Sequence, residues 1–252
     1  MRGDVIKSAG WVFELLELFD ELERPVGLKE VASRLGYPES SAAALLRSLV
    51  TMGYLLHDRT TRTYAPTIRV ARLGQWVAAR LIGEERIDRL AARLADETGE
   101  TILVGIQNDL WTHYVRAIEA RRPLRYVVTP GTQRLMVRSG IGWSLLSLLG
   151  DDTVRSIARR STALPEAEGL DIDPDALLAL VRKVRRDGHV VSRHTVNQGV
   201  GVLAAPVPRT AVPVPLAIGI AGPVDRLEPR QAALLDTLHR AIDAVVPDRT
   251  EA

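Results

Sequence analysis

Hydrophobic positions in the first third of the chain repeat with helical spacing. Residues 5–22 carry apolar side chains three and four positions apart, which predicts a helix that buries Ile6, Ala9, Val12, Phe13, Leu16 and Phe19. Residues 28–35 repeat this spacing with Leu28, Val31, Ala32 and Leu35, and Gly36 is suited to end that helix. The next helix is predicted to begin at Pro38, to be capped by Ser40 or Ser41, and to bury Leu45, Leu46, Leu49 and Met52.

The pattern changes after Gly53, which is predicted to end this helix. Residues 54–56 and 63–65 are expected to form two short strands, and residues 57–62 a polar tip that contains Arg59 and Arg62. A helix, a tight turn, a second helix and a two-stranded wing, in this order, are typical of a winged helix-turn-helix, which places its second helix in the DNA major groove. The other interpretation is a helical hairpin of an ordinary α-domain. We expect residues 1–66 to be a DNA-binding domain that is mainly α-helical.

Periodicity then indicates a linker and a second domain. Residues 67–83 are predicted to form a linker helix, on which Trp76 is a candidate contact to a second copy of the chain. Further helices are expected over residues 84–97, 139–149, 151–160, 174–186 and 226–246, the fourth capped by Asp173. Alternating β-rich segments predict strands over residues 101–107, 111–117, 124–128, 189–194, 201–207 and 214–221. This mixture predicts an α+β domain with a central antiparallel sheet over residues 84–252.

Composition limits the possible environments and partners. The chain has 252 residues, 46% of them hydrophobic, and a formal net charge of only +2, so contact with DNA must depend on local placement of charge. The absence of cysteine excludes disulfides and thiolate metal sites. No apolar run reaches the roughly 18 residues that suggest a membrane span, and residues 1–20 lack the plan of a signal peptide. We expect a cytoplasmic protein without membrane contact.

Motifs of catalysis are weak. Gly142-Trp143-Ser144 lacks the closing glycine of a nucleophile elbow. His189 and His194 are five positions apart on a predicted strand, so they face opposite sides and make a poor metal pair. We therefore expect no enzyme activity, no cofactor and no bound metal. An enzyme built on the α+β domain remains the alternative from another class.

Six segments together resemble the IclR-type transcriptional regulators, over nearly the whole chain. They are the predicted winged helix and residues 96–106, 123–147, 185–191, 197–207 and 216–227, which include DETGETILVGI, NQGVGVLAAPV and LAIGIAGPVDRL. The resemblance implies a homodimer or dimer of dimers on a palindromic operator. It also implies that the C-terminal domain is GAF-like and binds a small organic effector.

The resemblance assigns DNA contact to one helix face and to the wing. The expected residues are Ser40, Ser41, Ala43, Ala44, Arg47, Arg59 and Arg62. Relatives often carry a polar residue and an arginine where this chain has Ala43 and Ala44. We therefore expect fewer base contacts and more dependence on DNA shape and phosphates. A solvated face for the arginines, and helix capping alone for the serines, are the simpler alternatives.

The resemblance also assigns an effector site. Its expected residues are Arg138, Ser139, Gly140, Ile141, Ser192, His194, Gly219 and Ala221. Relatives often have an acidic run in place of residues 192–195, and serines in place of Gly219 and Ala221. Two readings follow: a larger, more apolar acid whose carboxylate meets Arg138 or the helix N-terminus, or a degenerate pocket in a regulator that needs no ligand.

Overall fold

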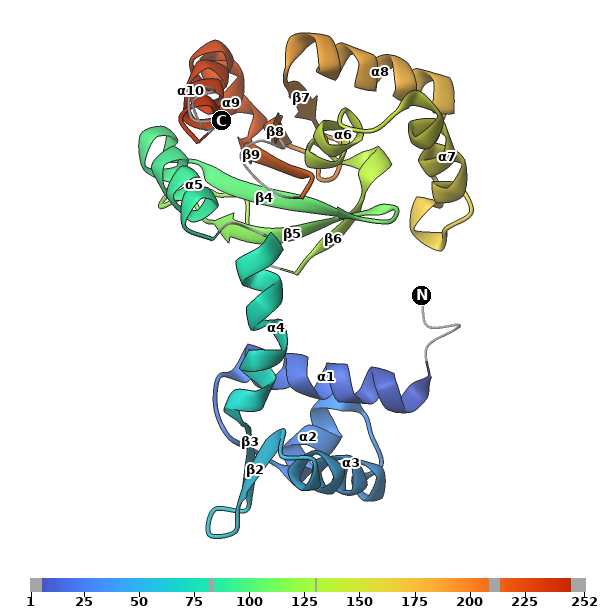
Figure 1. Cartoon of the computed structure of the whole chain (residues 1–252), viewed down its shortest axis with the longest axis vertical. Coiled ribbons are helices and arrows are strands. Elements are labelled where there is room, and N and C mark those ends of the chain that lie inside the picture. Colours follow the sequence, from blue (N-terminus) through green and yellow to red (C-terminus); the bar gives the residue numbers. More distant parts are fainter. Residues whose placement is uncertain (1–5, 82–83, 130, 209–213, 246–252) are drawn as a thin grey trace. The chain divides into compact units, whose positions relative to one another are not determined.

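The computed structural model describes residues 6–81, 84–129, 131–208 and 214–245, with side chains omitted for residues 75–85 (Figure 1). The chain divides into two compact units, Met1–Ala78 and Ala79–Ala252, and each is described separately below. The Trp76 side chain, residues 82–83 of the expected linker and Val246 lie outside the described parts. Among the described residues, no helix has both the length and the apolar character needed to cross a bilayer.

The first unit contains the predicted helix-turn-helix and wing. Its elements are α1 (Lys7–Leu22), β1 (Val26–Gly27), α2 (Leu28–Leu35), α3 (Glu39–Thr51), β2 (Leu55–Asp58), β3 (Thr63–Pro66) and the start of α4 (Ile68–Leu81). Gly36 ends α2 in the left-handed conformation, with φ of 68°, as the pattern predicts. The strands form a three-stranded antiparallel sheet in the order β1-β3-β2, so the wing has one more strand than expected.

The predicted buried stripes of α1 and α3 are confirmed in part: Phe19, Leu46 and Leu49 are buried as expected. In α1 the buried residues are Leu15, Leu18 and Phe19, whereas Phe13 is 66% exposed. In α3 the buried residues are Ala42, Leu46 and Leu49. Met52 is 55% exposed because α3 ends at Thr51 and the buried stripe ends with it.

The predicted serine cap of α3 is wrong. Pro38 is the N-cap, and no side chain accepts a hydrogen bond there. Ser40 and Ser41 lie within the first turn of the helix instead. The hydroxyl groups of Ser40 and Ser41 therefore make no N-cap hydrogen bond in α3.

The second unit is built around a six-stranded sheet. Its strands are β4 (Thr101–Asn108), β5 (Trp111–Ile118), β6 (Gln133–Leu135), β7 (Val190–Arg193), β8 (Val200–Val207) and β9 (Leu216–Pro223). They lie in the order β6-β5-β4-β9-β8-β7, and every neighbouring pair is antiparallel. This confirms the predicted α+β class with a central antiparallel sheet.

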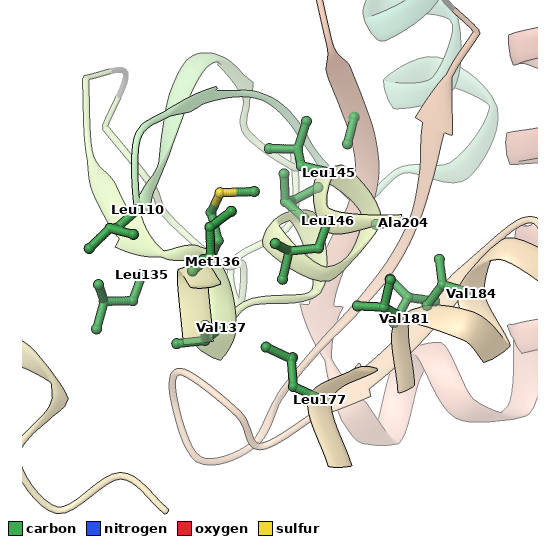
Figure 2. Packing of buried hydrophobic residues seen from close by; sticks show 14 of the residues in the cluster. Leu110, Leu135, Met136, Val137, Leu145, Leu146, Leu177, Val181, Val184 and Ala204 are labelled. Atoms are coloured by element: carbon green, nitrogen blue, oxygen red, sulfur yellow. The ribbon is translucent and has the colours of Figure 1, made fainter. Parts of the chain in front are cut away.

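Helices cover both faces of this sheet (Figure 1). One face packs against α5 (Glu84–Thr98) and α10 (Gln231–Asp243), and the other against α6 (Gly140–Leu146), α7 (Asp151–Ser161) and α8 (Pro174–Asp187). Strand β9 is buried on both sides: Leu216, Ile218 and Ile220 lie in the α5–α10 core, and Ala217 and Ala221 in the α6 core. Small residues therefore mark the face on which α6 lies close to the sheet. Figure 2 shows the core around α6 and α8.

Several helix predictions for this unit are confirmed. In α5 the predicted stripe Ile87, Leu90, Ala91 and Leu94 is buried. Asp173 caps α8 by accepting from the Asp175 N–H at 2.9 Å. Gly188 ends α8 with φ of 74°.

Two predicted elements differ. Residues 124–128 are not a strand, because β6 pairs with β5 instead and side chains bind the carbonyl groups of the segment. Thr101 Oγ1 donates to the Tyr126 carbonyl at 2.7 Å, and Arg226 Nη1 to the Leu124 carbonyl at 2.9 Å. The closing helix is divided into α9 (Val224–Leu227), a 3-10 turn (Glu228–Arg230) and α10, because Pro229 cannot donate a backbone hydrogen bond.

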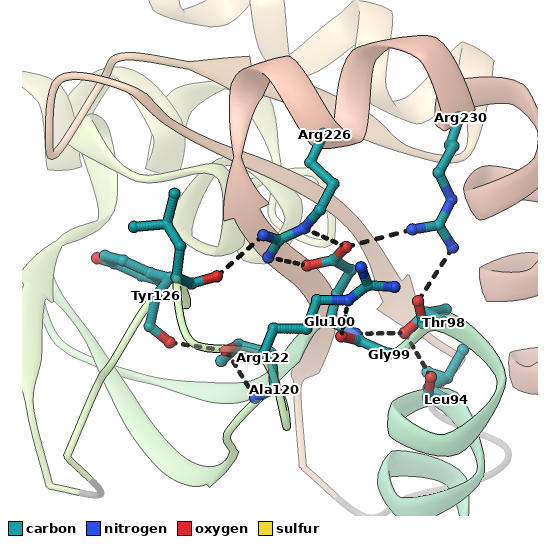
Figure 3. Close-up of polar contacts among 11 residues, drawn as sticks. Leu94, Thr98, Gly99, Glu100, Ala120, Arg122, Tyr126, Arg226 and Arg230 are labelled. Carbon is teal, nitrogen blue, oxygen red and sulfur yellow. Dashed lines mark hydrogen bonds and ion pairs between the residues drawn. The ribbon is translucent and has the colours of Figure 1, made fainter.

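A buried carboxylate holds these segments together. Glu100, immediately before β4, is fully buried, and its two oxygens accept from Arg226 Nε and Nη2 at 2.7 and 2.6 Å (Figure 3). Arg230 Nη1 donates to the same carboxylate at 3.2 Å, and its Nη2 to the Thr98 carbonyl at 3.0 Å. The cluster therefore joins the end of α5 and β4 to the α9 region, and through Arg226 to residue Leu124.

Candidate nucleic-acid interface and effector site

The outward side of α3 is one continuous stripe. Ser40, Ala44, Arg47 and Thr51 follow one another at helical spacing and are all exposed, opposite the buried stripe. Ser41 and Ala43, also predicted to contact DNA, are half-buried at its edges. Thr51 was not among the predicted residues, although its spacing from Arg47 could have identified it. The stripe presents one guanidinium among short side chains.

The turn between β2 and β3 is fixed by one carboxylate. Asp58 Oδ1 accepts from the Thr60 N–H at 2.8 Å and from the Thr61 N–H at 3.4 Å. The Thr60 hydrogen bond is the main reason that the pKa of Asp58 lies below its ordinary value. Arg59 and Arg62 are both exposed in this turn, so the wing tip carries two positive charges against one negative charge.

The end of α3 is attached to the start of α4. Gly53 follows α3 with φ of 77°, and its carbonyl accepts from Thr67 Oγ1 at 2.8 Å. Arg69 Nη1 donates to the Met52 carbonyl at 2.8 Å, and its guanidinium lies 4.8 Å from the Tyr54 ring centre. Carbonyl groups at the end of α3 thus find partners on α4. No pattern of hydrophobic positions could have predicted this joint.

Six of the eight predicted effector-site residues are brought together and buried. They are Ser139, Gly140, Ile141, Ser192, Gly219 and Ala221. Arg138 is half-buried, and it donates to the Thr195 carbonyl at 3.2 Å and the Val196 carbonyl at 3.4 Å. His194 is exposed on a left-handed turn, and its Nδ1 accepts from the Gly199 N–H at 2.9 Å. Arg138 and His194 therefore form hydrogen bonds with backbone groups of the loop between β7 and β8.

Close contacts at three glycines leave little space around Ile141 and Ser192. A Cβ added at Gly219 would lie 2.7 Å from Ile141 Cδ1, and one added at Gly105 would lie 2.6 Å from Ile141 Cγ2. A Cβ at Gly140 would lie 2.6 Å from Ser192 Oγ. Real Cβ atoms do not approach neighbours this closely, so the glycines are what allow α6 to lie directly on the sheet.

The N-terminus of α6 is also occupied. Ser139 is its N-cap, and its hydroxyl oxygen accepts from the Gly142 N–H at 3.0 Å. The helix spans only seven residues, so its dipole is small. Burial raises the pKa of the neighbouring Tyr114 to about 12, which keeps its hydroxyl protonated. An anion at this position would displace polar contacts that the chain already makes.

Comparisons with known proteins agree with this architecture. Residues 84–246 match the family model described as bacterial transcriptional regulator IclR C-terminal, and residues 12–59 match the IclR helix-turn-helix domain. The chain is 26% identical over 237 residues to the HTH-type transcriptional regulator BhcR of Paracoccus denitrificans, which covers 94% of this chain and 85% of BhcR. It is 24% identical over 206 residues to the HTH-type transcriptional regulator KdgR of Escherichia coli, covering 82% and 78% of the two chains.

Solved structures share the fold over almost the full length. The crystal structure of IclR from Thermotoga maritima superposes with a TM-score of 0.71 at 16% identity, covering 95% of this chain and 99% of that one. The IclR regulator from Alicyclobacillus acidocaldarius gives a TM-score of 0.68 at 20% identity, covering 96% of both. Together with the two family models, these matches identify the chain as a member of the IclR family: a DNA-binding transcriptional regulator with a C-terminal effector domain.

Proposed function

We propose that the protein binds a palindromic operator as a homodimer or a dimer of dimers, with α3 in the major groove and the wing on the flanking backbone. The observation that carries this proposal is the exposed stripe of α3, in which Arg47 is the single charged side chain among small ones. A helix face of this kind can approach base edges closely. Residues 67–83 would then link each DNA-binding head, residues 1–66, to the effector domain, residues 84–252.

The test is a binding titration with the intergenic DNA upstream of the protein's own gene, at two salt concentrations and with excess non-specific competitor. Arg47→Ala should weaken specific binding by about 5-fold to 160-fold, because a bidentate arginine–guanine contact is worth roughly 1–3 kcal/mol. Arg34→Ala, on α2 outside this stripe, is the matched control. Equal affinity of the wild type for operator and competitor DNA would contradict the proposal.

Two alternatives concern the effector domain: modulation by a small, acidic or aromatic effector, or regulation that needs no ligand. The close contacts of Ile141 with Gly105 and Gly219 favour the second, because an effector at the expected position would have to displace that side chain. We propose that the domain keeps one arrangement without a bound effector.

A truncation of Ile141 tests this choice. Ile141→Ala should leave an apolar cavity and cost about 2–5 kcal/mol of unfolding free energy, and the variant should gain a thermal shift with benzoate that the wild type lacks. Leu178→Ala, equally buried on α8, controls for loss of stability elsewhere. A saturable benzoate shift in the wild type that disappears in Arg138→Ala would support the effector alternative instead.

A further inference from the structure

The outward stripe of α3 has a restricted recognition chemistry. Residues 40–51 contain no Asn, Gln, Asp or Glu. Adenine is typically read by Asn or Gln and cytosine by Asp or Glu, whereas guanine is read by Arg and thymine by contact with its methyl group. The stripe therefore lacks the usual readers of adenine and cytosine and retains those of guanine and thymine.

The hydroxyl of Ser48 does not add a free donor to this surface in the structure. Its Oγ donates to the Ala44 carbonyl at 2.9 Å, so its proton is used within the helix. Arg47 remains as the long donor, and the methyl group of Ala44 is the exposed apolar group on the N-terminal side of it. At the centre of the stripe, the surface is therefore one strong donor next to a methyl group, with the short hydroxyl side chains of Ser40 and Thr51 at its two ends.

A hollow on this surface leaves room for a base edge. It is shallow and open to solvent, and it is lined by Ala44, Arg47, Ser48, Thr51 and Met52. Ala44 makes this space possible, because any longer side chain there would extend into it. A thymine methyl group entering the hollow would meet the Ala44 methyl group without a polar group between them.

Helix geometry fixes the distance between the two contacts. Ala44 and Arg47 are three positions apart, so they lie roughly 5 Å from each other along the helix surface. Successive base pairs are about 3.4 Å apart. The two side chains therefore reach base pairs that are one or two steps apart. Ala44 is a better candidate than Thr51, since base contacts come mainly from the N-terminal part of a recognition helix.

We propose that each operator half-site presents a guanine to Arg47 and, one or two base pairs away, a thymine whose methyl group contacts Ala44. This inference rests on the proposed function, because it requires α3 to occupy the major groove. It assigns Ala44 as a specificity-determining residue. Compared with a long polar side chain at this position, alanine makes an apolar contact with a base in place of a hydrogen-bonded one.

The experiment starts with selection of random duplex DNA by the full-length protein, followed by substitution in the enriched site. Replacing the thymine by deoxyuridine removes only its methyl group and should weaken binding about fourfold, the value of one buried carbon. Replacing the guanine by 7-deazaguanine removes one acceptor and should weaken binding at least fivefold. Because these changes are made on the DNA, the result does not depend on a variant folding.

Protein variants connect each base to its reader. Ala44→Gly should bind the thymine and deoxyuridine sites equally and remain sensitive to 7-deazaguanine, whereas Arg47→Ala should show the reverse. Ala9→Gly, at an exposed position of α1 outside the expected DNA contacts, is the matched control and should respond as the wild type does. Thermal melting of each variant checks that the DNA-binding unit is folded.

The two levels of failure are distinguishable. If selection enriches no motif, the proposed function itself is wrong. If it enriches a motif without the guanine–thymine pair, or if deoxyuridine leaves wild-type affinity unchanged, the protein is still a sequence-specific regulator and the inference about Ala44 is overturned.

Discussion

Replacing Glu100 by glutamine should destabilise the effector domain more than any surface charge substitution. The carboxylate is fully buried and accepts two hydrogen bonds from Arg226 and one from Arg230. Glutamine has almost the same shape but leaves both guanidinium groups without their counter-charge. Breaking a fully buried pair costs about 3–5 kcal/mol, and the partial exposure of Arg226 (21%) and Arg230 (39%) places this variant toward the lower end of that range.

The expected loss of stability is large enough to be measured by thermal unfolding. In a domain of this size, 1 kcal/mol corresponds to about 2–4 °C in Tm, so Glu100→Gln should lower Tm by roughly 6–20 °C. Asp236→Asn is the matched control, because Asp236 pairs with Arg240 at 3.1 Å on the exposed side of α10. That pair should contribute less than about 1 kcal/mol.

Calorimetry or circular dichroism, together with urea titration, measures both variants. A second variant that replaces Glu100 by Leu and both arginines by Met should recover much of the loss, since no buried charge is then left unpaired. The reasoning would be refuted if Glu100→Gln and Asp236→Asn unfolded within about 1 kcal/mol of each other.

Two further predictions concern the wing and a histidine pair. Arg59→Ala with Arg62→Ala should reduce the slope of log affinity against log salt by about 1.8, because each phosphate contact releases about 0.9 of a counterion; a slope equal to that of the wild type would exclude the wing from DNA. The rings of His189 and His239 lie 5.2 Å apart, and burial, followed by the charge of His239, lowers the pKa of His189. The folded state therefore favours neutral His189. This preference contributes fully to the free energy of unfolding above the unfolded pKa of about 6.5, and the contribution is lost as the pH falls from there through the lower pKa of the folded state. His239→Leu should make Tm fall less between pH 7.5 and 5, and an unchanged pH dependence would contradict this.

The sequence predicted elements whose cause is local. The stripe of α5, the left-handed Gly36 after α2 and the Asp173 cap of α8 depend on residues within a few positions of one another, and all three are present. Strand β9 was also predictable, because its residues are buried on both faces and form one apolar run.

The errors come from partners that are distant in sequence. Residues 124–128 have apolar character, but their carbonyl groups are bound by Thr101 and Arg226, so no strand forms there. The periodicity of α1 could not decide which of its apolar residues would face α2 and which would remain exposed like Phe13. For the effector site, the small residues were visible in the sequence, but the contact of Ile141 with Gly105 was not.

The order of strands in the sheet has a consequence for synthesis of the chain. Strand β4 lies at the centre, and its register pairs Thr101 with Ala221, a residue made 120 positions later. The effector domain therefore cannot close its central sheet until residues 216–223 have left the ribosome, so an apolar β4–β5 hairpin keeps one edge open while residues 119–215 are synthesised. The DNA-binding unit is a compact unit within the first 78 residues and can fold much earlier. The DNA-binding unit can thus be folded before synthesis of the effector domain is complete.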